Sequence, residues 1–135
     1  MGESSRELSS EHISTRTGRG WMRKDGICQF VFNLHAEVKL EDAVSNIATV
    51  VKLTKGKASP LFVDIRGAKS ITLDARKYFS GKESGDAATA TALFVGGSVS
   101  RVLGNFFLRL DKPDYPISLF SSEPDAIQWL KTFIK

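Results

Sequence analysis

Residues 59–81, SPLFVDIRGAKSITLDARKYFSG, constrain the fold more than any other part of this chain. Leu61–Ile65 is a short apolar run behind a proline, which is typical of a buried strand in a parallel sheet. Arg66 and Gly67 interrupt this run, and Thr72 occupies the position expected for a helix N-cap. A strand, a loop and a capped helix form half of a βαβ unit, in which the loop lies at the ligand-facing edge of the sheet. The segment therefore predicts where a site lies, but not its chemistry.

Patterns elsewhere in the chain extend this unit into an alternating α/β order. Residues 13–19 alternate like an edge strand, and a turn at 24–26 leads into a strand whose Cys28, Phe30, Phe32 and Leu34 share one face. Residues 40–55 have apolar spacing typical of a helix, with Gly56 as its stop. Further segments are a helix at 72–79, a strand at 89–95, a helix at 99–110 capped by Ser98, a strand at 115–120 and a final helix.

This ββαβαβαβα order predicts an α/β fold with a mixed sheet of four or five strands and a parallel core covered by helices. We expect the strands 61–65 and 89–95 to be parallel neighbours near its centre. With 135 residues the chain is expected to form one domain over residues 12–135, preceded by a flexible polar tail at 1–11.

Composition excludes several classes of function. The net charge is +4, but no basic run exceeds two residues, so we expect no nucleic-acid partner. A single cysteine, Cys28, allows neither an internal disulfide nor a metal site with paired cysteines, and its apolar strand face indicates core packing. No stretch approaches the ~20 apolar residues of a membrane helix. These features predict a cytoplasmic protein without membrane insertion, metal or cofactor.

Several segments resemble a known family. They are Val63–Gly67, Ala75–Phe79, Ser98–Phe107, Tyr115–Phe120 and Ala126–Leu130. Together they cover most of the chain from about Arg16, and the chain looks like a member of an uncharacterised bacterial STAS-like family. The element order resembles the STAS domain of anti-sigma-factor antagonists, and the family is also described as related to the CRAL-TRIO lipid-binding fold. The resemblance implies a regulatory or protein-interaction module.

The antagonists carry a phosphorylated serine directly after an aspartate at the start of the helix that follows the third strand. Aligned through Asp64 and Gly67, this pair falls near Thr72 and Leu73 of this chain. The resemblance therefore implies that the phosphorylated serine is replaced by an apolar residue. Ser70 or Thr72 could accept a phosphate, although helix capping explains Thr72 equally well.

The candidate site is a polar crevice where the two central strands end. Gly96, Gly97 and Ser98 precede a helix start, where free backbone N–H groups and a nearby arginine can bind an anion. We expect the loops 66–71 and 96–99 to meet at this crevice. Its expected lining is Asp64, Arg66, Ser70, Thr72, Gly96, Gly97, Ser98 and Arg101. A structural ion pair and an ordinary tight turn explain the same residues.

Two functions remain open at this stage, and neither involves catalytic residues. The first is a non-catalytic interaction module that binds a protein partner or associates with itself as a homodimer. Its possible interaction face contains Gly104, Asn105 and Leu108, because Leu108 interrupts an otherwise polar helix face. The second is a binder of a small anion, nucleotide or lipid headgroup at the strand-to-helix loops. An enzyme ranks third, because no nucleophile with an adjacent base is recognisable.

Overall fold

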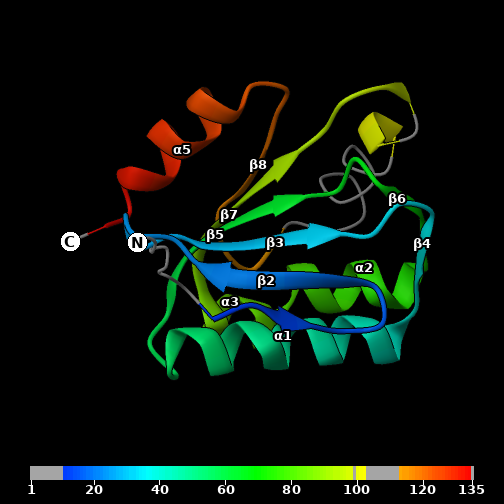
Figure 1. The fold of residues 1–135 in the computed structure, drawn as a ribbon, viewed down its shortest axis with the longest axis horizontal. Coiled ribbons are helices and arrows are strands. Elements are labelled where there is room, and N and C mark those ends of the chain that lie inside the picture. Colours follow the sequence, from blue (N-terminus) through cyan, green and yellow to red (C-terminus); the bar gives the residue numbers. More distant parts are fainter. Residues whose placement is uncertain (1–10, 99, 103–112, 135) are drawn as a thin grey trace, which may run out of the picture.

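The computed structural model describes residues 11–98, 100–102 and 113–134 of the chain. Helices and strands alternate after an opening antiparallel hairpin (Figure 1). The described strands are β1 (Ile13–Ser14), β2 (Gly18–Met22), β3 (Cys28–Phe32), β4 (Ala36–Val38), β5 (Ser59–Asp64), β6 (Ala68–Ile71), β7 (Ala88–Phe94) and β8 (Ile117–Phe120). The described helices are α1 (Leu40–Thr54), α2 (Leu73–Ser80), α3 (Lys82–Ala87) and α5 (Glu123–Lys131).

The main sheet confirms the predicted α/β class. Its strand order is β1-β2-β3-β5-β7-β8, with antiparallel pairing among β1, β2 and β3 and parallel pairing from β3 to β8. The prediction that β5 and β7 are parallel neighbours is confirmed by the pairing of Val63 with Leu93. Within the described residues the sheet has six strands rather than four or five, and β4 and β6 form a separate parallel pair.

The sixth strand arises because the predicted edge strand at residues 13–19 is divided in two. The chain turns at residues 15–17, where the Thr15 N–H donates to the Gly18 carbonyl at 2.8 Å. The hydroxyls of Thr15 and Thr17 bond the Asn46 side chain of α1, so the turn brings both polar groups to a hydrogen-bond partner. The alternating sequence pattern could not predict this turn, because Asn46 lies 29 residues from Thr17 along the chain.

The predicted loop at residues 66–71 is also wrong in part, because Ala68–Ile71 forms β6. This strand pairs with β4 through Ala36 and Ala68 and through Val38 and Ile71. Figure 1 places the pair beyond the carboxyl ends of β3 and β5. Strands this short are marginal alone, and these two are held by the residues that they bury in the core, Ala36, Val38, Ala68 and Ile71.

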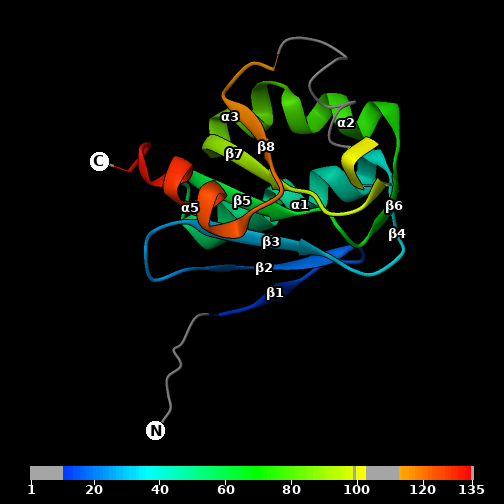
Figure 2. The same cartoon turned by 90° about the horizontal axis from the view of Figure 1, so that it is seen from above.

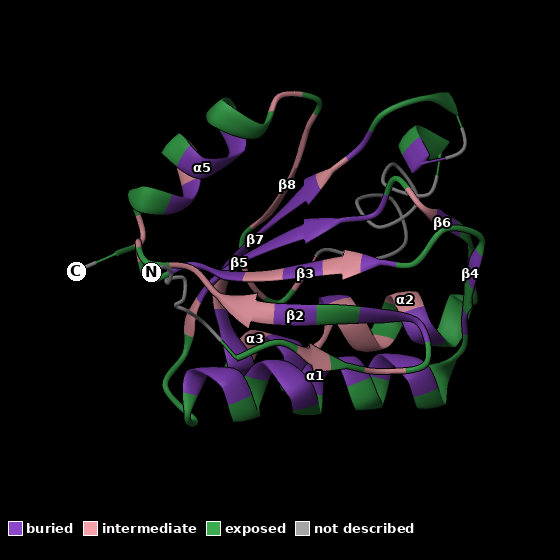
Figure 3. Ribbon diagram, in the orientation of Figure 1, coloured by how far each residue is buried: buried purple, intermediate pink, exposed green. Residues whose placement is uncertain are grey.

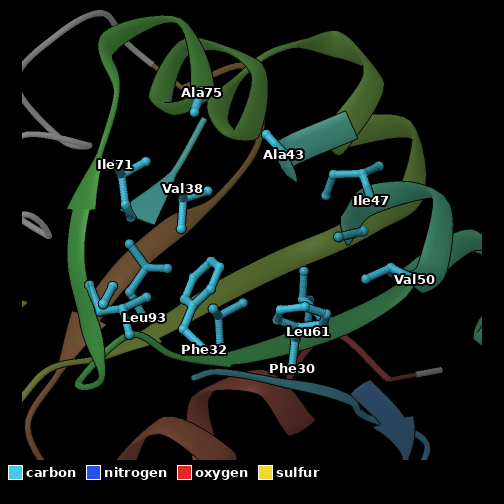
Figure 4. Packing of buried hydrophobic residues seen from close by; sticks show 14 of the residues in the cluster. Phe30, Phe32, Val38, Ala43, Ile47, Val50, Leu61, Ile71, Ala75 and Leu93 are labelled. Atoms are coloured by element: carbon cyan, nitrogen blue, oxygen red, sulfur yellow. The ribbon is translucent and has the colours of Figure 1, made fainter. Parts of the chain in front are cut away.

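Buried side chains form one cluster on each face of the main sheet. α1, α2 and α3 cover one face, where Phe30, Phe32 and Leu61 meet Ile47 and Val50 of α1 (Figure 4). α5 covers part of the opposite face, and Figure 2 shows it across the sheet from the other helices. β5 contributes to both clusters, which is the burial expected of a central parallel strand (Figure 3).

The helix limits follow the sequence signals closely. α1 ends at Thr54, and Lys55 and Gly56 adopt positive φ angles of 56° and 78° in its C-terminal turn. Thr72 caps α2 as predicted, because its side chain accepts a bond from the Ala75 N–H. Only the first residues of the predicted 99–110 helix are described. No helix in the described part of the chain is long and apolar enough to cross a membrane.

One ion pair, between the exposed Arg16 and the buried Asp42, ties the start of α1 to the turn after β1. The Asp42 carboxylate accepts the Lys39 N–H at 2.9 Å and the Arg16 Nε at 2.9 Å, and Arg16 Nη2 also contacts it. Asp42 is only 5% exposed, and its bond to the Arg16 guanidinium holds the pKa of this carboxyl below its ordinary value. Asp42 therefore acts as both a helix cap and a clamp on the edge of the sheet.

We predict that Asp42→Ala lowers the free energy of unfolding by about 1–2 kcal/mol at pH 7, the typical effect of losing a helix cap. Folding lowers the pKa of Asp42, so the ionised carboxylate stabilises the folded protein fully above pH ~4. This stabilisation is lost as the pH falls through the pKa that Asp42 has in the folded protein. Urea denaturation of both proteins should therefore give a difference that shrinks in acid. Glu41→Gln, an exposed change in the same turn, is the control and should leave stability nearly unaltered. A difference that persists unchanged well below the folded pKa would contradict this role.

Candidate functional site

Asp64 and Arg66 form a close ion pair at the carboxyl end of β5. Arg66 donates from Nε to Asp64 Oδ1 at 3.0 Å and from Nη2 to Oδ2 at 2.8 Å. The Arg66 backbone N–H also donates to Oδ1 at 3.0 Å. The carboxylate is thus bonded by the residue two positions later, which fixes the loop, and its bonding raises the pKa of the Arg66 guanidinium.

The aromatic ring of Phe94 completes the support of this arginine. The Arg66 guanidinium carbon lies 4.2 Å from the centre of that ring, at the end of the neighbouring strand β7. A side chain added at Gly96 would meet Arg66 Cδ at 3.1 Å, so the arginine runs close to the next loop. Ion pairing and stacking together hold Arg66 in one orientation while half of its side chain, 52%, stays exposed.

A shallow, open hollow lies beside this ion pair. Among the described residues it is lined by Phe32, Leu34, Asp64, Arg66 and Gly67. Leu34 is 77% exposed, although strand alternation predicted that it shares the buried face of Phe32. β3 ends at Phe32, and the turn through His35, whose φ is 66°, carries Leu34 out into solvent. The hollow is therefore partly apolar, and the positively charged guanidinium group of Arg66 is held at its side.

The other predicted residues of the α2 loop lie apart from the lining of the hollow. Ser70 is exposed on β6, and its neighbour across the β4–β6 pair is Glu37. The Thr72 hydroxyl contacts the Asp74 carboxylate while it caps α2. Leu73 follows as the first residue of α2 and is 47% exposed. An apolar side chain thus occupies the exposed helix start.

Backbone groups around the glycine pair are already partly bonded. The Gly96 N–H donates to the Ser100 hydroxyl at 2.8 Å, and that hydroxyl donates to the Gly96 carbonyl at 2.8 Å. Gly97 has a φ of 87°, which explains the glycine at that turn, and its carbonyl accepts the Arg101 N–H. Ser98 and Arg101 are exposed. The sequence did not reveal Ser100, whose buried hydroxyl takes the place that an anion would need at Gly96.

Other candidate features have simple structural explanations. Gly104, Asn105 and Leu108, the predicted interaction face, lie outside the described residues. Cys28 is fully buried, and burial raises the pKa of its thiol to about 12, as expected for core packing. No group of three acidic, histidine or cysteine side chains in the described ranges is arranged to hold a metal ion.

The core between the main sheet and its helices contains one small apolar cavity. Its volume is about 30 Å³, and its lining includes Phe79, Leu93 and Ile117. A cavity that binds benzene has ~150 Å³, so this space is too small for a lipid tail. At its margin the buried Tyr115 hydroxyl donates to the Phe79 carbonyl at 2.9 Å and bonds Thr91 at 3.1 Å.

We predict that Gly67→Ala lowers the free energy of unfolding of the protein more than Gly96→Ala does. A Cβ atom at Gly67 would lie 2.9 Å from the carbonyl oxygens of Phe32 and Asn33, which are fixed backbone atoms. At Gly96 the nearest atom is Cδ of the Arg66 side chain at 3.1 Å, and a side-chain methylene can shift slightly more easily than a backbone carbonyl can. Denaturant unfolding should show a loss of about 1–3 kcal/mol for Gly67→Ala and clearly less for Gly96→Ala. Equal losses would mean that the backbone at Phe32 and Asn33 is not packed tightly against Gly67.

Comparisons with known proteins agree with this fold. One similar structure is that of an uncharacterised protein from Shewanella loihica, which belongs to the DUF3478 family and is described as having a SpoIIAA-like fold. The TM-score between the two structures is 0.51 at 16% sequence identity, and the match covers 96% of this chain and 98% of that one. The anti-sigma factor antagonist SpoIIAA, in its unphosphorylated form, gives a TM-score of 0.54 at 13% identity over 84% of this chain and 97% of its own.

These likenesses confirm the predicted STAS-like fold, which is that of SpoIIAA. No curated protein matches the sequence. A family model described as "Domain of unknown function (DUF7793)" matches residues 20–134, which is most of the chain. The chain therefore belongs to this DUF7793 family, an uncharacterised family with a STAS-like fold.

Proposed function

We propose that this protein is a non-catalytic regulatory module of the bacterial cytoplasm that binds a protein partner at the carboxyl edge of its sheet. The proposal rests on Leu34, whose side chain is 77% exposed and lies beside the ordered side chain of Arg66. We call Leu34, Arg66 and Gly67, together with Leu73 beyond the opposite end of the β4–β6 pair, the carboxyl-edge surface. The SpoIIAA-like fold supports the proposal, because that relative is named an anti-sigma factor antagonist.

The composition of the carboxyl-edge surface suits a protein partner. Burying an exposed leucine contributes about 2 kcal/mol, and this surface offers both Leu34 and Leu73. Arginine is enriched among the residues that dominate interface energetics. Arg66 is already ordered by Asp64 and Phe94, so little conformational entropy is lost when a partner contacts it.

We further propose that binding is not switched by a phosphate at the start of α2. Leu73, in the position where the resemblance implies a serine, has no hydroxyl. The hydroxyl of the adjacent Thr72 contacts Asp74, and a phosphate there would lie beside a like charge. Association would therefore be governed by the amounts of the two proteins or by a change in the partner.

Binding of a small anion or lipid headgroup remains a prediction with weaker support. Arg66 is neutralised by Asp64, and the Gly96 N–H is bonded to Ser100. The core cavity of about 30 Å³ gives no room for an acyl chain. We therefore prefer the protein partner.

Site-specific photocrosslinking in the native cells tests this proposal. A photoreactive amino acid at position 34 or 73 should capture the same protein, as an adduct heavier than the 14.8 kDa chain. The same amino acid at Gln128, an exposed position on α5, is the matched control and should not capture it. An adduct of two copies of this chain would indicate self-association instead.

A second variant tests whether the surface acts as one unit. Leu34→Glu should abolish the adduct formed from position 73 while leaving the fold intact, because Leu34 is already in solvent. The proposal fails if neither position 34 nor position 73 forms an adduct, or if all three positions capture the same proteins equally.

A further inference from the structure

A second apolar surface runs along the outer side of α1. Leu40, Val44 and Val51 are 40%, 43% and 41% exposed, and Ala48 between them is exposed as well. At 3.6 residues per turn these four side chains fall within an arc of about 80°. We call them the α1 stripe. The sequence pattern counted these four residues together with Ala43 and Ile47 as the apolar positions of the helix, but the core takes only Ala43 and Ile47 of that set, together with Val50 and Leu53.

Described neighbours of α1 cover its other sides. The helix packs on β2, β3, α2 and α3, and Figure 3 shows exposed residues recurring along its free side. A helix whose apolar residues extend well beyond its core-facing arc is typically covered by another element. Three of the large exposed hydrophobic side chains of the described residues gather on this one helix.

The charges beside the α1 stripe indicate what covers it. Glu41 and Lys52 are exposed, lie on the same flank of the stripe, and stand at its opposite ends. In an antiparallel pair of α1 helices related by a two-fold axis, Glu41 of each copy lies beside Lys52 of the other. A parallel pair would not bring these opposite charges together. Charge complementarity thus selects a second copy of this chain in antiparallel orientation.

We propose that the protein forms a weak two-fold homodimer through antiparallel packing of the α1 stripe. Ala48 near the middle of the stripe allows the two helices to approach closely. The stripe spans 12 residues, or about 17 Å of helix from its first Cα to its last, so the contact buries less than the ~800 Å² per partner of a standard interface. Association is therefore concentration-dependent, and it leaves Leu34 and Arg66 of the carboxyl-edge surface free for a partner.

Sedimentation velocity from roughly micromolar to near-millimolar protein tests the dimer. The wild-type chain should shift from a 14.8 kDa monomer toward twice that mass as its concentration rises. Val44→Glu should remain monomeric throughout. Ile134→Glu, which adds the same charge at another exposed apolar residue, should dimerise like the wild type.

Charge exchange tests the antiparallel geometry. Glu41→Lys and Lys52→Glu should each weaken dimerisation about fivefold or more, because each places like charges together twice across the two-fold axis. The double variant Glu41→Lys/Lys52→Glu should restore the wild-type dissociation constant. Thermal melts of each variant confirm that the monomer is folded. A chain that stays monomeric at every concentration, a Val44→Glu variant that still dimerises, or a double variant without recovery would overturn the proposal.

Discussion

Burial of β5 on both faces is the constraint on which the rest of the structure depends. Phe62 enters the cluster beneath α5, while Leu61 and Val63 enter the cluster beneath α1. A strand of this kind needs a parallel neighbour on each side and helices on both faces. β3 and β7 meet the first need, and α1 and α5 meet the second. The parallel strands then end at one edge, where the segments that follow β3 and β5 build the carboxyl-edge surface.

The same constraint explains how the residues at that edge are held in place. Asp64 is the last residue of β5, and its carboxylate is bonded to Arg66, which in turn stacks on Phe94 of β7. The ion pair fixes the loop that follows β5, and the stacking on Phe94 joins this loop to the end of β7. In the proposed function, a partner would therefore meet an arginine that the fold already holds in place.

Sequence periodicity predicted the elements whose signals are local. α1 and its stop at Gly56, the cap at Thr72 and the strand pair β5–β7 all follow from spacing and capping residues. The β4–β6 pair was missed, because strands of three or four residues form only when distant segments meet. The exposure of Leu34 and of the α1 stripe was missed too. An apolar pattern identifies a helix or strand, but it cannot say which side chains the rest of the chain leaves uncovered.

The proposed function requires that a partner binds at the carboxyl edge of the sheet. Hydrogen–deuterium exchange of the protein alone and of its complex with the captured partner locates the bound surface. In the complex, the amides of residues 33–37 and 66–74 should be protected, while those of α5 and of the turn at residues 23–27 exchange as before. Protection confined to α5 or to that turn, with the carboxyl edge unchanged, would contradict the proposed function.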